Sequence, residues 1–248
     1  MAINYYEKYL KYKQKYLNLQ LSMKGGMPSI NETELTNWQL ITRSGGGDIY
    51  RIYYMDMIYT YKKITPRILE ETIENLQTLD DQFRRMSYFP NLIVPLYLVK
   101  DGEAIVGYLM RFLNNYKNLD SITHQLDINR FMIILNNICD GFLNMYACDV
   151  VPCPEHGNNI MVNDENEVVF IDLDDILKCA ANNEKDTLAQ LNIIFMNLPK
   201  KIVENVNFLR LFDIDIVSGD HKLKIEFDTV AGLKKRITEI AVGMGLLL

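Results

Sequence analysis

Two side chains that suit a magnesium ion flank a hairpin-like pattern in the segment VVPCPEHGNNIMVNDENEVVFIDLDD, residues 150–175. Asn159 comes directly before the apolar triplet 160–162, and Asp172 comes directly after the strand-like run 168–171. Mg²⁺ prefers oxygen ligands and commonly shares them with substrate phosphates. An amide and a carboxylate that face a nucleotide would supply part of a Mg²⁺ shell, although Asn in a turn and Asp at a strand end are also common without a metal.

A run of glycines and a lysine further upstream suit phosphate groups. Gly45, Gly46 and Gly47 lie between two strand-like runs, in the pattern G-x-G-x-x-Y-x-I that ends at Ile52. Residues without side chains let backbone N–H groups approach phosphate oxygens, but taken alone such a run is as often a flexible hairpin. Lys62, in the alternating segment YTYKKI (59–64), adds an ammonium group that could meet phosphates as a point charge. The combination predicts a phosphate-binding site.

The elements that must position these residues follow from hydrophobic periodicity and turn residues. A helix is expected to begin near Pro66 and to stop at Phe89-Pro90-Asn91, and a longer helix is expected over 128–146. A tight turn at Met55-Asp56 is expected to join two strands, and the polar stretch 114–119 is expected to be a hinge. The strands are predicted at 38–41, 49–54, 57–64, 92–99 and 104–113. This mixture of strands and helices predicts an α+β fold.

With these motifs in this order, residues 38–198 resemble the protein kinase superfamily. In that comparison, residues 150–151 take a strand position, Asn159 and the triplet 160–162 follow in register, and Asp172-Leu173-Asp174 stands where kinases have Asp-Phe-Gly. The resemblance implies a two-lobed fold that binds ATP and Mg²⁺ in its cleft. It implies an N-terminal helix and linker (1–27), a five-stranded N-lobe with one helix (28–114) and a reduced, mainly helical C-lobe (115–248).

The same resemblance implies a role for each matching residue. Gly45, Gly46 and Gly47 would cover the phosphates, Lys62 would meet the α and β phosphates, and Asn159 and Asp172 would hold Mg²⁺. A kinase lysine also pairs with a carboxylate on the following helix. We expect Glu74 in that place, whereas Asp80 or Asp81 fits if the count runs back from residues 89–91. The other interpretation of these acids, together with Glu70 and Glu71, is an ordinary solvated face.

The chain departs from kinases at the catalytic base. Pro154 stands where the family has the aspartate that accepts the substrate proton, and Cys153 replaces the neighbouring arginine. Proline has no titratable group, so we expect a pseudokinase with impaired or absent phosphotransfer that acts through a protein partner. One alternative is an active phosphotransferase, on a protein or a small molecule, that uses Glu155 or His156 as its base. Another is a structural viral protein with an empty cleft.

Composition restricts the partners and the compartment. A formal charge of −6 and a pI near 5.2 argue against a general binder of nucleic acid or of anionic membranes. The four cysteines contain no C-x-x-C pair, which favours a reducing compartment. The N-terminal run YYEKYLKYKQKYL (5–17), within a helix expected over 3–23, is similar to a leader on many proteins of giant, mimivirus-like DNA viruses. That similarity implies a viral origin and a place in the host cytoplasm or the virion.

Overall fold

The structure is a computed structural model that describes residues 27–151, 159–173, 177–178, 188, 200–205 and 229–246. The helix expected over 3–23 lies outside the described residues, as do Pro154, Glu155 and His156. The chain divides into two compact units, Met1–Leu113 and Asn114–Leu248. Each unit contains both strands and helices, so the α+β prediction is confirmed.

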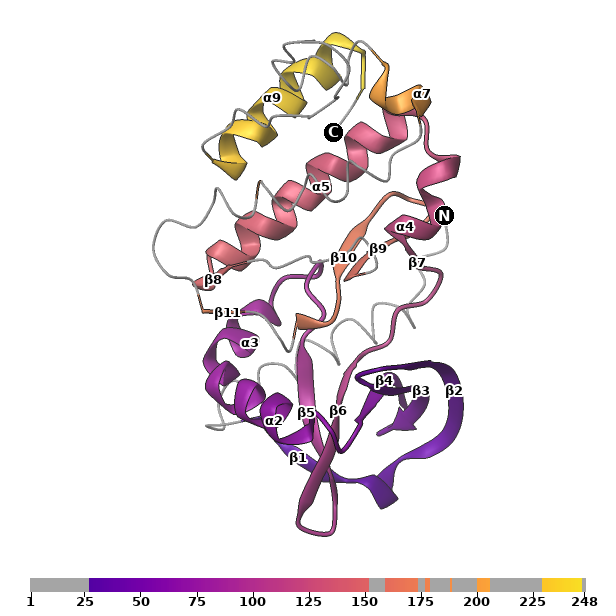
Figure 1. The fold of residues 1–248 in the computed structure, drawn as a ribbon, viewed down its shortest axis with the longest axis vertical. Helices are drawn as coiled ribbons and strands as arrows, with labels where there is room; N and C mark the ends of the chain where they lie inside the picture. Colours follow the sequence, from indigo (N-terminus) through magenta and orange to yellow (C-terminus); the bar gives the residue numbers. More distant parts are fainter. Residues whose placement is uncertain are drawn as a thin grey trace. The chain divides into compact units, whose positions relative to one another are not determined.

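The first unit is built on a six-stranded sheet with the order β1-β5-β6-β4-β3-β2 (Figure 1). Its strands are β1 Ser29–Asn31, β2 Thr36–Ser44, β3 Gly47–Tyr54, β4 Met57–Ile64, β5 Pro95–Asp101 and β6 Ala104–Arg111, with a 3₁₀ turn, η1, at Glu32–Glu34. β1 runs parallel to β5, and the other neighbouring pairs are antiparallel. The predicted turn at Met55-Asp56 is confirmed, with φ of 49° and 60°, the positive values that a tight two-residue hairpin needs.

The expectation of five strands and one helix is wrong in two details. The sixth strand, β1, has only three residues, too few to show a period, and it is held by backbone pairing such as the Leu98 N–H that donates to Pro28 O at 2.8 Å. The helix is divided into α2, Leu69–Thr78, and α3, Asp80–Met86, by Leu79 at φ −99° and ψ 8°. Acidic residues are favourable at a helix N-terminus, so Asp80 and Asp81 favour the start of a new helix, α3, at this point. The hydrophobic period alone predicts one continuous helix.

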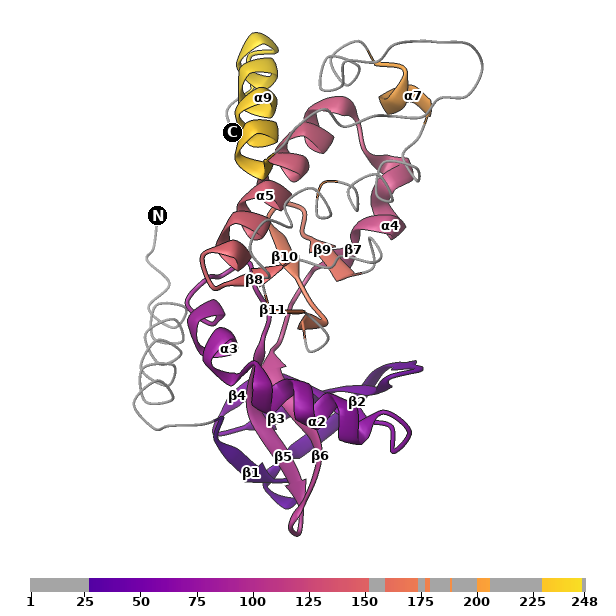
Figure 2. The ribbon, with the colours of Figure 1, turned by 60° about the vertical axis from the view of Figure 1, so that its left-hand side comes forward.

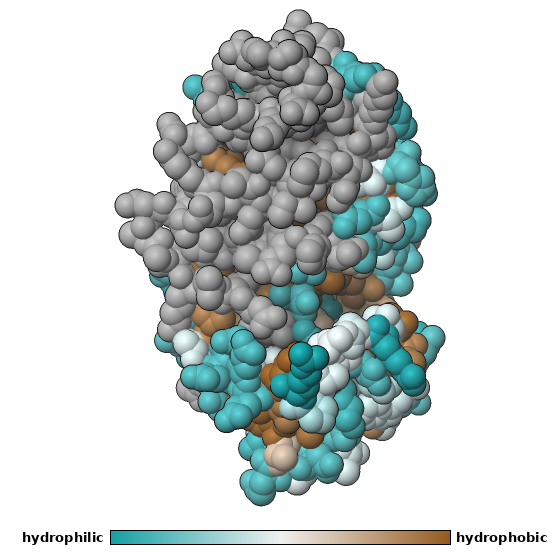
Figure 3. Space-filling view, in the orientation of Figure 1, coloured by the Kyte–Doolittle hydropathy of each residue, from teal (hydrophilic) through white to brown (hydrophobic). Residues whose placement is uncertain are grey.

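β2 is one of the two edge strands of this sheet, and all nine of its residues are exposed. Trp38, Leu40 and Ile41 are 41%, 43% and 51% exposed, so half of the exposed large hydrophobic side chains of the described residues lie on this strand. The hydropathy surface shows hydrophobic patches among the hydrophilic residues of the first unit (Figure 3). The buried part of the sheet lies further in, at strands β4 to β6.

The second unit is organised around a long buried helix, α5, Ile128–Tyr146. Asp127 caps it by accepting from the Arg130 N–H at 2.8 Å. The helix α9, Val230–Gly243, packs against α5, and an ion pair joins Lys234 to Asp140. The remaining elements are β7 Lys117–Asn118, α4 Leu119–Ile122, η2 Thr123–Gln125, β8 Val150–Val151, β9 Ile160–Val162, β10 Val168–Phe170, β11 Leu177–Lys178 and α7 Lys200–Val203.

Two small antiparallel sheets complete the second unit. One has the order β10-β9-β7, and the other pairs β11 with β8. The hairpin formed by β9 and β10 runs beside α5 in both views (Figures 1 and 2). Among the helices in the described part of the chain, none combines the length and the apolar character needed to cross a membrane.

Candidate functional site

The glycine run forms a two-residue turn, Gly45-Gly46, between β2 and β3. Both carbonyl groups of this turn are used: Thr65 donates its N–H to Gly46 O at 3.2 Å and its hydroxyl to Gly45 O at 3.4 Å. No hydrogen bond from the N–H of Gly45 or Gly46 to another described residue is found. Hydrogen bonds to the two carbonyl oxygens therefore hold the turn in place, while its two backbone N–H groups stay available to an anion.

Close packing explains why the residue after this turn, Gly47, must be glycine, and it places Gly46 of the turn beside Lys62. Gly47 has φ +153°, and a Cβ atom there would lie 2.2 Å from the backbone oxygen of Lys63, so only glycine fits. A Cβ atom on Gly46 would lie 3.7 Å from Lys62 Cε and 3.9 Å from its Nζ. The predicted glycine turn and Lys62, the lysine predicted to contact phosphate, therefore lie next to each other within the first unit.

Lys62 is almost fully buried, at 5% exposure, which is unusual for a lysine. Its ammonium lies 5.7 Å from the centre of the Tyr108 ring, on the neighbouring strand β6. In the strand register Ile49 lies directly opposite Lys62, and directly opposed residues of an antiparallel pair share a face. Ile49 therefore lies on the same face of the sheet as Lys62. Ile52, the last residue of the predicted glycine pattern, lies on the other face.

The neighbouring lysine has a different environment, on the other face of the sheet. Lys63 Nζ lies 2.9 Å from Glu32 Oε1, and the Tyr61 hydroxyl donates to the same oxygen at 2.8 Å. Burial, followed by this contact with Glu32, raises the pKa of Tyr61 above its ordinary range. Tyr50, at the third position of the glycine pattern, stacks on Tyr61 on this face and donates to Asp48 at 3.1 Å. Lys63 thus serves a surface ion pair, and Lys62 is the lysine beside the glycine turn.

The carboxylate partner predicted for Lys62 stays a prediction. Glu74 lies on the exposed side of α2, and in the described part of the chain no ion pair joins it to Lys62. Asp80 instead pairs with Arg84 at 2.9 Å, and its burial raises its pKa above the ordinary value because desolvation outweighs the lowering effect of Arg84. Asp81 pairs with Arg84 too. Asp80 and Asp81, the residues predicted as alternatives to Glu74, therefore stabilise the start of α3 through Arg84.

The second unit places the two predicted metal ligands at the same end of one hairpin. β9 and β10 pair with Ile160 opposite Phe170, and beyond that pair the Ile171 N–H donates to Asn159 O at 2.9 Å. Asp172 is the next residue, and it is exposed. Its φ of +60° is uncommon for a residue other than glycine, and such backbone conformations concentrate at functional sites. The expected neighbourhood of Asn159 and Asp172 is therefore present in the backbone.

Gly141 on α5 contacts this hairpin closely, a role that the sequence motifs did not predict. A Cβ atom on Gly141 would lie 2.0 Å from the Phe170 ring, so the ring occupies the space that glycine leaves. Phe170 also packs on Phe142, with ring centres 5.3 Å apart. An isolated glycine in the middle of an apolar helix is the sequence signal of such a contact.

The donor set of the second unit fits a Mg²⁺ ion only in part. In the described ranges no group of three or more His, Cys, Asp or Glu side chains is arranged to hold a metal. Asn159 and Asp172 supply one amide oxygen and one carboxylate, and Mg²⁺ needs six oxygen ligands. Phosphate and water oxygens would have to complete the shell, which is the usual arrangement at nucleotide sites.

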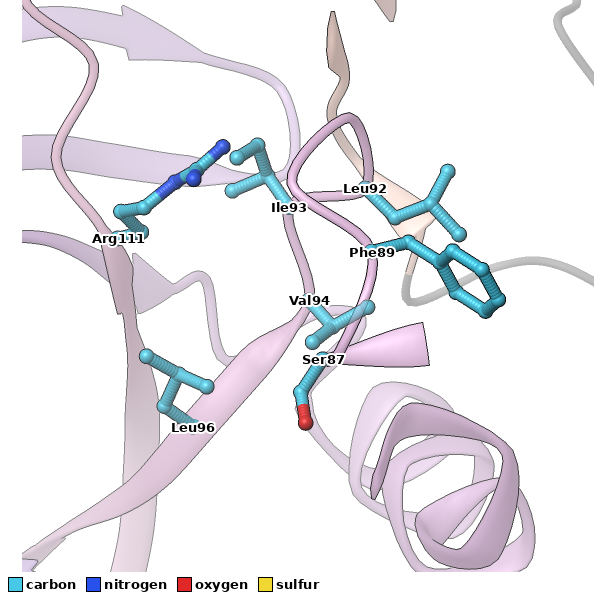
Figure 4. Close-up of a pocket in the computed structure, with 7 residues that line it drawn as sticks. All are labelled: Ser87, Phe89, Leu92, Ile93, Val94, Leu96 and Arg111. Atoms are coloured by element: carbon cyan, nitrogen blue, oxygen red, sulfur yellow. The ribbon is translucent and has the colours of Figure 1, made fainter. Parts of the chain in front are cut away.

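A small cavity in the first unit is not a nucleotide site. Its volume is about 50 Å³, whereas pockets for small ligands have volumes of roughly 300–1,000 Å³. Figure 4 shows its lining residues, which come from the turn before β5, from β5 and from β6: Ser87, Phe89, Leu92, Ile93, Val94, Leu96 and Arg111. Neither the glycine turn nor Lys62 contributes to it.

A comparison of the sequence with protein-family models and with curated proteins finds no match. The assignment of functional residues therefore depends on the geometry within each unit.

Proposed function

We propose that this protein binds a nucleoside triphosphate, ATP, together with Mg²⁺ in a kinase-like, two-lobed fold, and that phosphotransfer is impaired or absent. Its function would then come from the bound state, through a protein partner. One observation carries the proposal: the glycine turn lies against the side chain of a buried lysine, with its two N–H groups free of contacts to described residues. This combination of donors and positive charge suits a polyphosphate.

The second unit supports the metal half of the proposal. Asn159 and Asp172 lie at one end of the β9–β10 hairpin, and their side chains are oxygen donors of the kind that Mg²⁺ takes when it is also bound to phosphates. When bound, Mg²⁺ would neutralise phosphate charge. Lys62 and the N–H groups of Gly45 and Gly46 would hold the phosphate oxygens.

Paired variants in the two units test the proposal by thermal unfolding. Ligand binding stabilises a folded protein by about 1.4 kcal/mol at ten times its Kd, so millimolar Mg²⁺-ATP should raise the Tm of the wild-type protein. Lys62→Ala should abolish the rise, whereas Lys63→Ala, the adjacent exposed lysine paired with Glu32, should keep it. Asp172→Ala should abolish the rise in the same way, and Asp164→Ala, an exposed residue of the hairpin turn, is its control.

The outcome separates the proposal from its alternatives. A Tm that does not respond to Mg²⁺-ATP would remove nucleotide binding and would favour a structural role. A response that is the same in Lys62→Ala and Lys63→Ala would show that nucleotide binds elsewhere. Transfer of radiolabelled phosphate that is lost in Glu155→Gln or His156→Ala would instead establish an active phosphotransferase with a displaced base.

A further inference from the structure

The turn of the β9–β10 hairpin is held by a dense set of hydrogen bonds that the proposed nucleotide contacts do not use. Arg130, in the first turn of α5, donates its Nε–H to Asn166 Oδ1 at 2.7 Å and its Nη2–H to Asn163 O at 3.3 Å. Asn137, further along α5, donates to Asn166 O at 2.8 Å. Two side chains of one helix therefore hold the hairpin turn from one side.

The turn is also closed within itself and held by the start of the second unit. Asn163 donates its side-chain amide to Glu167 Oε2 at 2.8 Å and accepts from the Glu167 N–H at 2.8 Å. The Tyr116 hydroxyl donates to the same carboxylate oxygen at 2.9 Å. Asn163 is buried, at 7% exposure, and Asn166 has φ +65°, so the turn takes one specific conformation instead of that of a simple exposed loop.

Helix α5 runs along the hairpin from this turn to the end that carries the metal ligands. Arg130, Asn137 and Gly141 recur at the spacing of one helical face. Arg130 and Asn137 hold the turn, and Gly141 accepts the Phe170 ring, two residues before Asp172. A two-stranded hairpin of three-residue strands has little stability alone. The position of the hairpin against α5 therefore depends on these contacts and on the pairing of β9 with β7.

We propose that Arg130 is a positioning residue for the metal site: by holding Asn166 and Asn163, it fixes the hairpin so that Asn159 and Asp172 face one Mg²⁺ ion. This inference rests on the proposed function. Arg130 holds the end of the hairpin opposite both ligands, so its role would not require contact with the nucleotide. Its planar guanidinium suits this role because it reaches two acceptors at once, which an ammonium group does less well.

The test compares the Kd for ATP in Mg²⁺ with the Kd for ATP in EDTA, measured on the full chain. Groups behind metal ligands affect metal affinity by about 10–100-fold, so Arg130→Ala should lower the ratio of the two affinities by about tenfold and leave the Kd in EDTA unchanged. Arg130→Lys should lie between Arg130→Ala and the wild type. Arg236→Ala, an arginine of α9 paired with Glu239, is the control and should keep the wild-type ratio.

Asn166→Gly breaks the same contact from the other side. Glycine accepts a φ of +65° without strain, so this variant removes Asn166 Oδ1, one of the two acceptors of Arg130, and keeps the turn. It should lower the ratio in the same direction as Arg130→Ala and by no more, because the bond to Asn163 O remains, and the double variant should be no worse than Arg130→Ala alone. An unchanged ratio in both variants, or an equal loss of affinity with and without Mg²⁺, would overturn the positioning role.

Hydrogen exchange of the Ile171 amide provides a second measurement that needs no nucleotide. This amide donates to Asn159 O at 2.9 Å, so its exchange reports whether the ligand end of the hairpin is formed. Arg130→Ala and Asn166→Gly should speed its exchange and leave the amides of β3 and β4 unchanged. Unchanged exchange at Ile171 would refute the positioning role directly, whereas faster exchange in a protein that does not bind ATP would refute only the proposed function.

Discussion

Gly141 offers a test of the packing of α5 on the β9–β10 hairpin, which carries the proposed metal ligands Asn159 and Asp172. An alanine Cβ there would lie 2.0, 2.7 and 3.0 Å from three atoms of the Phe170 ring. Carbon atoms pack best at about 3.5–4.0 Å, so the ring must move by about 1.5 Å or more. Overpacking of this kind costs about 1–3 kcal/mol, and alanine recovers about 1 kcal/mol through its better helix propensity. We expect Gly141→Ala to lower the free energy of unfolding by about 0–2 kcal/mol.

Gly243 provides a matched control for helix propensity. It is the last residue of α9, and a Cβ atom there would meet no atom within 4 Å in the described residues beyond its chain neighbours and its own helix. Gly243→Ala should therefore leave stability unchanged or raise it by up to about 1 kcal/mol. The difference between the two variants, about 0–3 kcal/mol, reports the clash with Phe170.

Urea unfolding followed by two signals locates the damage. The single tryptophan, Trp38, lies in the first unit, whereas α5 and α9 of the second unit contribute to far-UV circular dichroism. Gly141→Ala should shift the dichroism transition and leave the tryptophan transition in place. Phe170→Leu should partly rescue Gly141→Ala, with a coupling energy of about 0.5 kcal/mol or more. A Gly141→Ala protein that gains as much stability as Gly243→Ala would refute the packing argument.

Two further predictions follow from buried titratable groups. Burial raises the pKa of Cys139 to about 12, so its thiol stays protonated at pH 8. Peptide mass spectrometry should therefore show that iodoacetamide labels Cys139 only after unfolding. Rapid labelling of the native protein would contradict its burial. Burial also raises the pKa of Asp80 above its ordinary value of 3.8, so the folded state favours the protonated carboxyl, and stability at this site increases as the pH falls through the raised pKa toward 3.8. Asp80→Asn should remove this increase when urea midpoints at pH 7 and pH 4 are compared. Asp81→Asn, on an exposed side chain whose charge is a lesser cause of the raised pKa, should keep most of it; the same pH response in both variants would count against the Asp80 assignment.

The elements that local patterns determine were predicted well. The strand Met57–Ile64 and the helix Ile128–Tyr146 have the predicted bounds, and the turn at Met55-Asp56 is present. These elements are long or strongly periodic, or they contain a turn between two clear strands, so sequence alone is sufficient. Strand β1 and the break at Leu79 were not predicted, because a three-residue strand has no period and the break interrupts a hydrophobic period that continues past it.

The sequence also predicted the types and the order of the site residues. They are a glycine turn, a lysine on the third predicted strand (57–64), and an Asn and an Asp that flank one hairpin. Alternation along a strand shows that Lys62 and Lys63 face opposite sides. It does not show which side is buried, because burial depends on what other parts of the chain place there.

Only the tertiary structure decided which contacts form across the sequence. The arrangement of whole elements put Ile49 opposite Lys62, Tyr108 near its ammonium, and the Phe170 ring in the space left by Gly141. It also joined Arg130 to a turn more than thirty residues away, between Asn163 and Glu167. Such partners are selected by the packing of whole elements, and a sequence pattern describes only the neighbours within one element.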